Sequence, residues 1–233
     1  MSVILEYKAV NKNFGEKQVL KNINLKIESN KIIGLLGKNG SGKSTLFKLV
    51  NDLLTASSGE ILVDNKAVSV ETKKIVSYLP ERPYLNPHMK VSEAIKIFET
   101  FYDDFSTEKA EKLLIDLDLD KNMRLSKMSK GMKEKVQLVL VMSRKAKLFI
   151  LDEPLGGVDP ASRDYILQTI LKNFDEDATL LISTHMISDV EKILDEVIFI
   201  DNGEIILQEN ADELRTRENC SIDEFFRRKF YVK

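Results

Sequence analysis

Eight consecutive residues near the start of the chain have the types and the spacing that bind phosphate. The stretch "GKNGSGKS" fits the pattern G-x-x-x-x-G-K-[ST], with Gly37, Gly42, Lys43 and Ser44 at the fixed positions. Residues without bulky side chains let successive backbone N–H groups turn inward around an anion. A helix that begins near Gly42 would point its positive end at the same anion. We therefore expect Lys43 to reach the β- and γ-phosphates of ATP and the Ser44 hydroxyl to ligate Mg²⁺.

The whole loop and the residue after it are candidate nucleotide contacts. These residues are Gly37, Lys38, Asn39, Gly40, Ser41, Gly42, Lys43, Ser44 and Thr45. A glycine-rich surface loop that matches by chance is the alternative. The context favours the phosphate site, because the buried run "KIIGLL" precedes the loop and apolar residues follow it at helical spacing. Those apolar residues are Leu46, Leu49, Val50, Leu53 and Leu54.

Two adjacent carboxylates end a second buried strand. "LFILDEP" has four apolar residues and then Asp152 and Glu153. Ligands of an open α/β sheet gather at the carboxyl ends of its strands, so one carboxylate can support Mg²⁺ while its neighbour polarises the attacking water. A solvated strand end could have the same two residues. His185 ends the next apolar strand, "TLLISTH", and this place favours a γ-phosphate contact over an ordinary surface or core histidine.

Short apolar runs alternate with helical patterns along most of the chain. Residues 3–27 indicate antiparallel strands, "SSGEILVDNKAV" a hairpin, and "EVIFIDNGEIILQ" two strands around an Asn-Gly turn. "DPASRDYILQTILKNF", "MISDVEKIL" and "SIDEFFRRKFYVK" indicate helices. We predict an α/β fold with a mostly parallel sheet covered on both faces.

The segment from about residue 83 to residue 147 differs from the rest because helical patterns dominate it. We therefore predict one domain over residues 1–233. Residues 1–82 and 148–233 would form the α/β core, with an antiparallel β subdomain at the N-terminus. Residues 83–147 would form an inserted helical lobe.

Composition limits where this chain can work. Its 233 residues are 43% hydrophobic, which is enough for one large core. A net charge of −2 gives no general attraction to nucleic acid, and we expect no nucleic-acid partner. The lone Cys220 fits a reducing compartment, and no apolar run approaches the roughly 20 residues of a membrane-spanning helix. We expect a cytoplasmic protein that reaches a membrane by docking on a partner.

With these motifs in this order, the chain resembles the ATP-binding subunit of ABC transporters over nearly its whole length. The decisive stretch is "LSKMSKGMKEK", which is similar to the family signature LSGGQ, with Ser129, Lys130, Gly131 and Met132 at the S-G-G-Q positions. A serine that caps a helix and is followed by glycine makes a second helix start that can bind an anion. Without the family, the same stretch is simply a well-capped amphipathic helix.

The resemblance implies a use for this second helix start. Two subunits would pair head to tail, and each signature helix would close over ATP held by the phosphate loop of the other subunit. The pairing is ordinary two-fold symmetry. One chain alone would hydrolyse ATP poorly, and the second subunit would be either a copy or a close relative.

Other positions match the family individually. Phe14 stands where the family stacks an aromatic ring on adenine, with a core phenylalanine as the alternative. Asp159, in "GGVDP", matches a loop that senses the opposite subunit, and Asp152 would support Mg²⁺ together with Ser44. The stretch "YLPERPYLNP" matches the loop that links the two lobes and faces an integral membrane permease.

Three residues depart from the common family pattern. Glu81 stands where many relatives have a glutamine that lies near Mg²⁺ and the attacking water. Its carboxylate can still bind magnesium, but it adds negative charge beside the phosphates. Lys130 replaces glycine and Met132 replaces glutamine in the signature. This combination resembles a branch of exporter subunits, so we interpret the departures as subfamily variation.

The main hypothesis is an ATPase that powers a transporter, an exporter by this branch resemblance, whose membrane-spanning parts are separate chains. Lys43, Mg²⁺ and the signature helix would neutralise charge, Glu153 would align water and His185 would contact the γ-phosphate. ATP binding would join two subunits and hydrolysis would release them.

The alternative hypothesis is a soluble ABC-type ATPase that acts in cofactor assembly, in translation or on DNA. Chromosome-type relatives separate the two motifs by long coiled coils, and no sustained heptads occur here. Translation-type relatives usually carry two phosphate loops, and this sequence has one. A small-molecule kinase would leave "MSKGM" followed by "LDEP" unexplained.

Overall fold

The strands form two sheets that pack on each other. The computed structural model describes residues 2–156 and 159–231. One sheet has six strands in the order β10-β9-β3-β8-β7-β6, and the other has four in the order β2-β1-β4-β5. The strands are β1 (Val3–Phe14), β2 (Lys17–Glu28), β3 (Ile32–Leu36), β4 (Ser58–Val63), β5 (Lys66–Ala67), β6 (Val76–Leu79), β7 (Leu148–Asp152), β8 (Thr179–Thr184), β9 (Glu196–Asp201) and β10 (Glu204–Asn210).

Strand directions confirm the predicted fold class. In the six-stranded sheet β6, β7, β8, β3 and β9 pair in parallel, and β10 is antiparallel to β9. All pairs of the four-stranded sheet are antiparallel. The parallel strands therefore end at one edge of the sheet, and both phosphate-facing motifs follow such ends.

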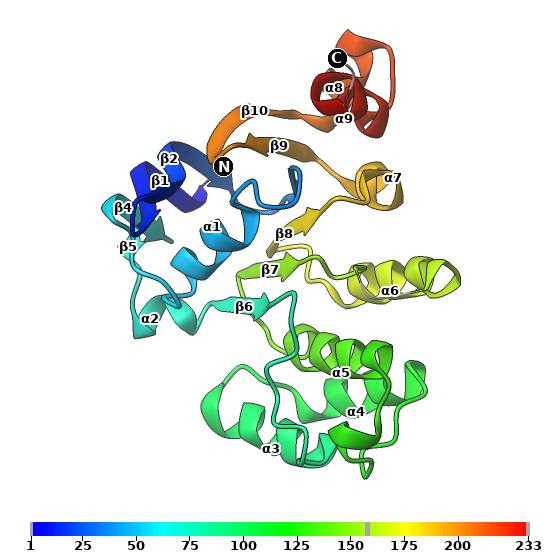
Figure 1. Cartoon of the computed structure of the whole chain (residues 1–233). Helices are drawn as coiled ribbons and strands as arrows, with labels where there is room; N and C mark the ends of the chain where they lie inside the picture. The colour runs from blue at the N-terminus through cyan, green and yellow to red at the C-terminus, as the bar shows by residue number, and fades with distance from the viewer. Residues whose placement is uncertain (1, 157–158, 232–233) are drawn as a thin grey trace.

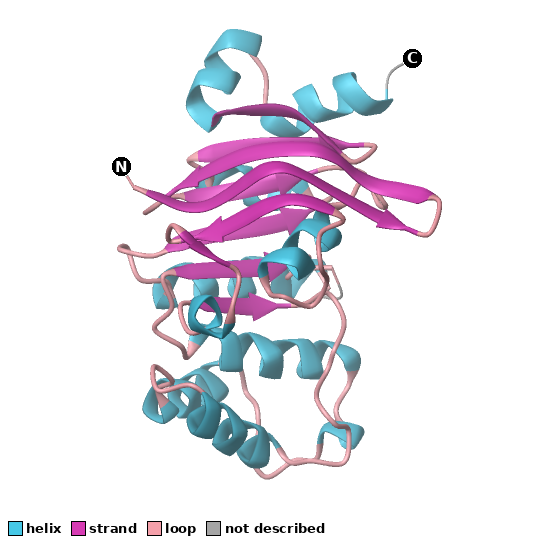
Figure 2. Ribbon diagram, turned by 90° about the vertical axis from the view of Figure 1, so that its left-hand side faces the viewer, coloured by secondary structure: helices cyan, strands magenta, loops and turns pink. Residues whose placement is uncertain are grey.

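Some helices cover the six-stranded sheet, and others form a separate group at one end of the molecule (Figure 1). Helices α3, α4 and α5 lie together on the far side of β6, where the helical lobe was expected, and α8 and α9 lie at the opposite end (Figure 2). The helices are α1 (Lys43–Val50), α2 (Val70–Lys73), α3 (Val91–Phe101), α4 (Thr107–Asp116), α5 (Lys130–Met142), α6 (Pro160–Asn173), α7 (Ile187–Val190), α8 (Ala211–Glu218) and α9 (Ile222–Tyr231). The exact division into domains stays a prediction.

Two hydrophobic clusters occupy the two faces of the six-stranded sheet. In β7, Leu148 and Ile150 belong to the cluster shared with α1 and the antiparallel sheet, whereas Phe149 and Leu151 belong to the cluster shared with the helical lobe. Alternate side chains of one strand thus fill opposite cores. This explains why the strand is apolar at successive positions rather than at every second one.

Two local expectations were wrong, and one helix was missed. Helix α1 ends at Val50 instead of continuing to Leu54, and Leu53 is 60% exposed; Asp52 has φ 55°, which breaks the helical path. The expected helix "MISDVEKIL" is one α-turn followed by a 3₁₀ turn over Glu191–Ile193. Helix α8 was not expected because it is mostly polar, but the Asn210 side chain caps it by accepting from the N–H groups of Asp212 and Glu213.

A buried arginine joins the helical lobe to β6. The guanidinium of Arg144 donates to the Asp104 carboxylate, with Nε 3.0 Å from Oδ1, and to the backbone carbonyls of Lys74 and Val76. Its carbon Cζ lies 3.8 Å from the ring centroid of Tyr102. Because a planar guanidinium can serve several acceptors at once, this side chain fixes the lobe against the strand that leads to Glu81.

Candidate nucleotide site

The phosphate loop bends sharply between β3 and α1, and two glycines make the bend possible. Gly42 has φ 116°, and a Cβ there would lie 2.7 Å from Leu20 Cδ2. A Cβ on Gly37 would lie 2.4 Å from the carbonyl oxygen of Ile200. Side chains at these positions would displace the loop or the neighbouring strands. Because α1 starts at Lys43, its unpaired N–H groups face the inside of the bend.

Lys43 places a buried ammonium inside this bend. Its Nζ donates to the carbonyl oxygens of Gly37 at 2.7 Å and Lys38 at 3.2 Å, and it lies 3.7 Å from Glu153 Oε1. Burial lowers the pKa of Lys43, and the charges of Glu153 and Asp152 oppose that shift. A cation that has lost water on most sides is stabilised strongly by an anion beside it.

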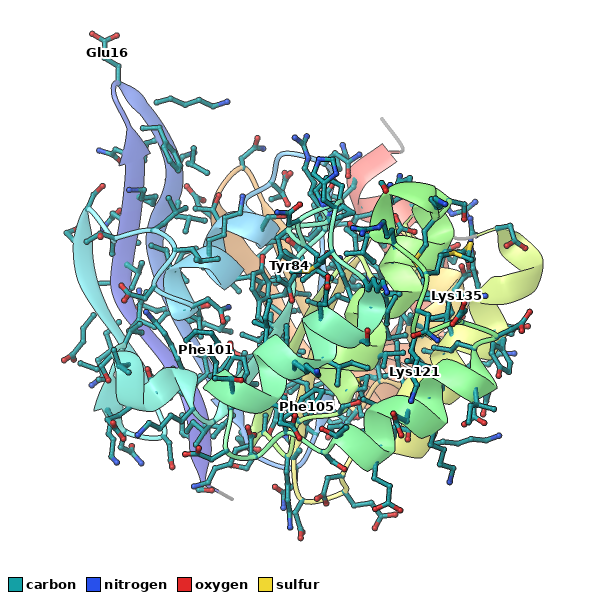
Figure 3. The ribbon with its side chains drawn as sticks, turned by 90° about the horizontal axis from the view of Figure 1, so that it is seen from below. Glu16, Tyr84, Phe101, Phe105, Lys121 and Lys135 are labelled. Carbon is teal, nitrogen blue, oxygen red and sulfur yellow. The ribbon has the colours of Figure 1, made fainter. Side chains whose placement is uncertain are left out.

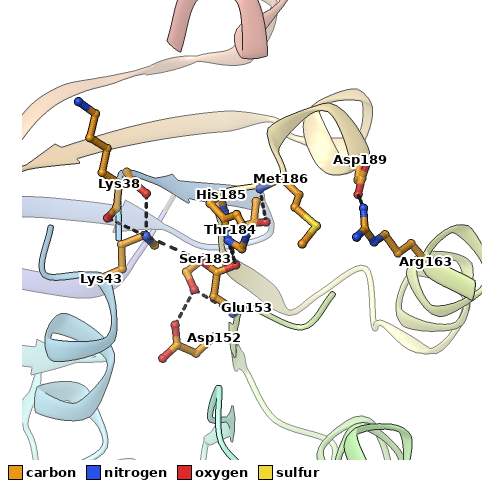
Figure 4. Close-up of polar contacts among 11 residues, drawn as sticks. Lys38, Lys43, Asp152, Glu153, Arg163, Ser183, Thr184, His185, Met186 and Asp189 are labelled. Atoms are coloured by element: carbon orange, nitrogen blue, oxygen red, sulfur yellow. Dashed lines mark hydrogen bonds and ion pairs between the residues drawn. The ribbon is translucent and has the colours of Figure 1, made fainter. Parts of the chain in front are cut away.

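The two carboxylates of "LDEP" lie at the carboxyl end of β7 and point to different partners (Figure 4). Ser183 donates its hydroxyl to Asp152 Oδ1 at 2.6 Å. Burial raises the pKa of Asp152, hydrogen bonds from Ser183 and Ser44 oppose the shift, and the charge of Glu81 adds to it. One region of the site thus holds oxygen atoms of Asp152, Ser44 and Glu81, and the two carboxylates give it a negative charge.

Glu153 has a backbone conformation that few side chains adopt. Its φ is 52°, and its N–H donates to the Ser183 carbonyl at 3.1 Å and hydroxyl at 3.0 Å. Its Oε2 lies 2.8 Å from His185 Nδ1. Left-handed backbone at a non-glycine residue is a strained state that persists where the surroundings enforce it, and such states cluster at functional sites. The bend turns the Glu153 carboxylate toward Lys43 and His185.

These residues line one cleft of about 1030 Å³. Most of the expected site residues lie in its wall: Phe14, Asn39, Gly40, Gly42, Lys43, Ser44, Thr45, Glu81, Lys130, Asp152, Glu153 and His185. The remaining expected residues do not line it: Gly37, Lys38, Ser41, Ser129, Gly131, Met132 and Asp159. Gly37 and Ser41 are buried residues of the loop itself, and the Lys38 side chain points away from the carboxylates (Figure 4).

An exposed aromatic ring marks one end of the cleft. Phe14 is 47% exposed at the end of β1, so the alternative that it is a core residue is wrong. Lys12 Nζ lies 4.8 Å from the centroid of the ring. The same end of the cleft is lined by Lys17 and Gln18 near the tip of the β1–β2 hairpin, where Glu16 projects from the molecule (Figure 3). Adenine stacking on Phe14 stays a prediction.

The donor set of the cleft suits magnesium. Mg²⁺ in proteins takes oxygen ligands, usually one or two carboxylates or hydroxyls together with substrate phosphates and water. Ser44, Asp152 and Glu81 offer that number of oxygen groups. Within the described part of the chain, no group of three or more His, Cys, Asp and Glu residues is arranged to hold a metal by itself. The site therefore fits a metal that arrives with phosphate.

Comparison with known proteins decides the family. The ABC transporter family model matches residues 20–156, which include the phosphate loop and both carboxylates. The chain belongs to the ABC transporter family of ATP-binding proteins. It is 29% identical to the ABC transporter ATP-binding protein YtrB of Bacillus subtilis over 91% of this chain and 74% of the relative. It is 31% identical to the glutamine transport ATP-binding protein GlnQ of Escherichia coli over 91% of this chain and 93% of that protein.

Solved structures of this family have the same fold. An ATP-binding subunit of an ABC transporter superposes with a TM-score of 0.85 at 26% identity, covering 96% of this chain and 98% of the other. No helix in the described residues of this ABC cassette is long and apolar enough to cross a lipid bilayer. The protein is thus an ATP-binding subunit of the ABC type, with the predicted fold.

The signature stretch of this ABC cassette forms a capped helix start. The Ser129 hydroxyl accepts a hydrogen bond from the Met132 N–H at 3.2 Å, which confirms the predicted cap of α5. Lys130 Nζ lies 3.8 Å from Glu134 Oε1 and is largely exposed. A Cβ on Gly131 would meet no atom within 4 Å beyond its chain neighbours and the backbone of its own helix turn. This glycine is therefore not required by the packing of its own chain.

Two residues that position the site were not predicted. Ser183 holds the Asp152 carboxylate and the backbone N–H of Glu153, and the signal for it was a hydroxyl inside the buried run "TLLIST", two residues before His185. Gln137 is 1% exposed, and its Oε1 accepts from the Tyr84 N–H at 3.0 Å. The signal for Gln137 was a polar residue in the apolar stretch of α5.

Gln137 holds the loop that carries Glu81. Among the described residues, no other hydrogen bond or ion pair given by the structure reaches residues 81–85. Proline at positions 80 and 83 removes two N–H donors from this stretch. The place of Glu81 beside Asp152 therefore depends on one hydrogen bond to the signature helix.

We predict that Gln137→Met, which keeps the length of the side chain and removes its acceptor, lowers kcat of ATP hydrolysis by about 10-fold. Leaving the partly buried N–H of Tyr84 unpaired and the loop untethered costs free energy of that order. The dissociation constant for ATP should stay within about twofold, because the phosphate loop is untouched. Gln137→Glu keeps an acceptor and should retain most of the rate. Equal rates for the Met variant and the wild type would contradict this role.

Proposed function

We propose that this cassette is a Mg²⁺-dependent ATPase that powers a membrane exporter by ATP-driven dimerisation. The observation that carries the proposal is the single cleft that joins a buried ammonium, two carboxylates of different environment and an exposed aromatic ring. Phe14 would stack on adenine at one end, and Lys43 with the loop amides would hold the phosphates at the other. Asp152, Ser44 and Glu81 would hold the metal, which supplies charge neutralisation at the β- and γ-phosphates.

Hydrolysis would depend on the position of Glu153. Its carboxylate, fixed by the backbone bend and by His185 Nδ1 at 2.8 Å, would accept a hydrogen bond from the attacking water. The water oxygen would bond to the γ-phosphorus as the bond to the bridging oxygen breaks, which yields ADP and phosphate. His185 would then present its other ring nitrogen to the γ-phosphate. Lys43 would offset the negative charge that develops on the phosphate oxygens.

The signature helix supports the proposal that a second subunit completes the site. Ser129 is exposed and Gly131 meets nothing in its own chain, although glycine inside a helix costs roughly 1 kcal/mol relative to alanine. A glycine that its own chain does not need is explained if a partner approaches that surface. A nucleotide held by the other subunit would lie over the capped start of α5. Asp159 would face the same partner.

A permease partner would explain a second surface. A groove of about 380 Å³ is lined by Pro83, Leu85 and Pro87 from the loop and by Leu125, Lys130, Lys133 and Gln137 from the lobe. Its apolar side chains would accept a segment of an integral membrane protein, and the chain would then lie at the inner face of the cell membrane. The name of GlnQ refers to transport, which supports coupling to a transporter. The export direction rests on the branch resemblance of Glu81, Lys130 and Met132.

We predict that Glu153→Gln traps a dimer. With ATP and Mg²⁺ the amide cannot act as a base, so the closed state should persist with nucleotide bound. Size-exclusion chromatography with light scattering should give about twice the monomer mass. Glu71→Gln, the same change at an exposed residue of α2, is the control and should remain monomeric. A Glu153→Gln protein that binds ATP and stays monomeric contradicts the two-subunit site.

We predict that Gly131→Ala separates folding from assembly. The methyl group meets no atom of its own chain, so the free energy of unfolding measured in urea should rise by up to about 1 kcal/mol. The same methyl would stand between α5 and the phosphates of a partner. Dimer formation in the Glu153→Gln background should therefore weaken by about 10-fold or more. Undiminished dimerisation would place this surface outside the interface.

We predict that the full chain, purified from detergent-solubilised membranes, retains an integral membrane protein. Leu85→Asp puts a charge into the groove and should release that partner, since an unpaired charge in an apolar contact is costly. Leu53→Asp, at a residue that is 60% exposed elsewhere, is the matched control and should not. Recovery without a membrane protein, in both the wild type and the control, would favour a soluble ABC-type ATPase instead.

A further inference from the structure

Helix α9 is fixed to β9 by a cluster of phenylalanines. The rings of Phe225, Phe226 and Phe230 lie 5.7, 5.5 and 5.9 Å from the ring of Phe199, measured between centroids. Phe226 and Phe230 also contact each other at 4.5 Å. Aromatic pairs at these distances add to the free energy gained by burial. The helix is thus attached to β9, one strand of the parallel part of the sheet.

The same strand supports the phosphate loop. The carbonyl oxygen of Ile200 lies so close to Gly37 that no Cβ fits between them. Just beyond β9, the N–H of Gly203 donates to the carbonyl of Ser41 at 3.0 Å. Gly37 and Ser41 of the loop therefore contact β9 or the turn that follows it, and α9 packs on the same strand.

Lys38 connects the loop to the helix directly. Its Nζ donates to the backbone carbonyl of Phe230 and lies 5.9 Å from the ring centroid of that residue. Figure 4 shows this side chain directed away from Asp152 and Glu153. The last carbonyls of a helix carry partial negative charge, so a cation is stabilised there. A lysine of the phosphate-binding motif is thus used to hold the C-terminal helix.

We propose that Lys38 is a positioning residue that acts through α9. By binding the last turn of α9 it holds the first half of the phosphate loop in the shape that receives phosphate, and α9 becomes part of the nucleotide-binding machinery. The proposal rests on ATP being the ligand of the cleft. It requires no contact between the Lys38 ammonium and the nucleotide.

Binding of a non-hydrolysable ATP analogue, measured by calorimetry, tests this role. Lys38→Met and deletion of residues 230–233 should each weaken binding by about 3- to 10-fold, part of what one charge-assisted hydrogen bond is worth. Lys38→Arg and the matched deletion of residues 232–233, which keeps Phe230, should stay within about twofold. Adding Lys38→Met to the longer deletion should weaken binding little further, because the deletion has already removed the carbonyl that Lys38 binds. KM for ATP should rise in the two weakened proteins while kcat at saturation is kept.

Amide hydrogen exchange of the nucleotide-free protein decides between positioning and direct contact. Lys38→Met should speed exchange across residues 37–42 without any ligand present. If exchange there is unchanged and binding still weakens, Lys38 touches the nucleotide itself and the proposal is overturned. It is also overturned if Lys38→Met binds as tightly as the wild type. A wild-type chain that binds no ATP analogue would instead remove the proposed function, and this inference with it.

Discussion

A buried positive charge is the constraint around which this protein is arranged. The Lys43 ammonium lies inside the bend between β3 and α1, with two loop carbonyls and the Glu153 carboxylate around it. Taking an ion out of water costs roughly several kcal/mol even after relaxation. The chain offsets this cost by ending β7 in Asp152 and Glu153 beside the same point. The Lys43 ammonium and the loop amides would match the charge of a phosphate, and the carboxylates would match a divalent cation bound with it.

The rest of the fold holds these charges in place with few contacts. Ser183 on β8 fixes the Asp152 carboxylate and the backbone N–H of Glu153, and the parallel register of β7 and β8 brings Asp152 opposite Ser183. Glu81 is less firmly held, because its loop is tethered by Gln137 alone among the hydrogen bonds described for residues 81–85. The carboxylates after β7 are therefore fixed from the sheet, and the loop that carries Glu81 is tethered from the helical lobe.

Much of this arrangement could be predicted because short motifs have strict local geometry. The glycines of the phosphate loop, the apolar run before Asp152 and the cap at Ser129 each leave few backbone solutions. Asp152 and His185 could be placed on one edge because parallel strands end together. By contrast, Gln137 and Ser183 act through partners 53 and 30 residues away, and no local pattern encodes such pairs. The direction of the Lys38 side chain was likewise hidden, because it depends on the packing of α9 against β9. Helix α8 was missed since only Ala211 and Leu214 are buried in it and its start depends on the Asn210 cap, so its sequence has no regular apolar pattern.

Calorimetric titration of the wild-type chain with a series of adenine ligands tests the account of the buried ammonium most directly. If Lys43 and the loop amides supply most of the binding free energy, affinity should fall by about 100-fold or more between ADP and adenosine, because each lost charge-assisted contact is worth roughly 1.5–3 kcal/mol. Mg²⁺ should strengthen the binding of ATP. Adenosine that binds as tightly as ADP would show that the phosphate loop is not the centre of the site, and the account would be wrong.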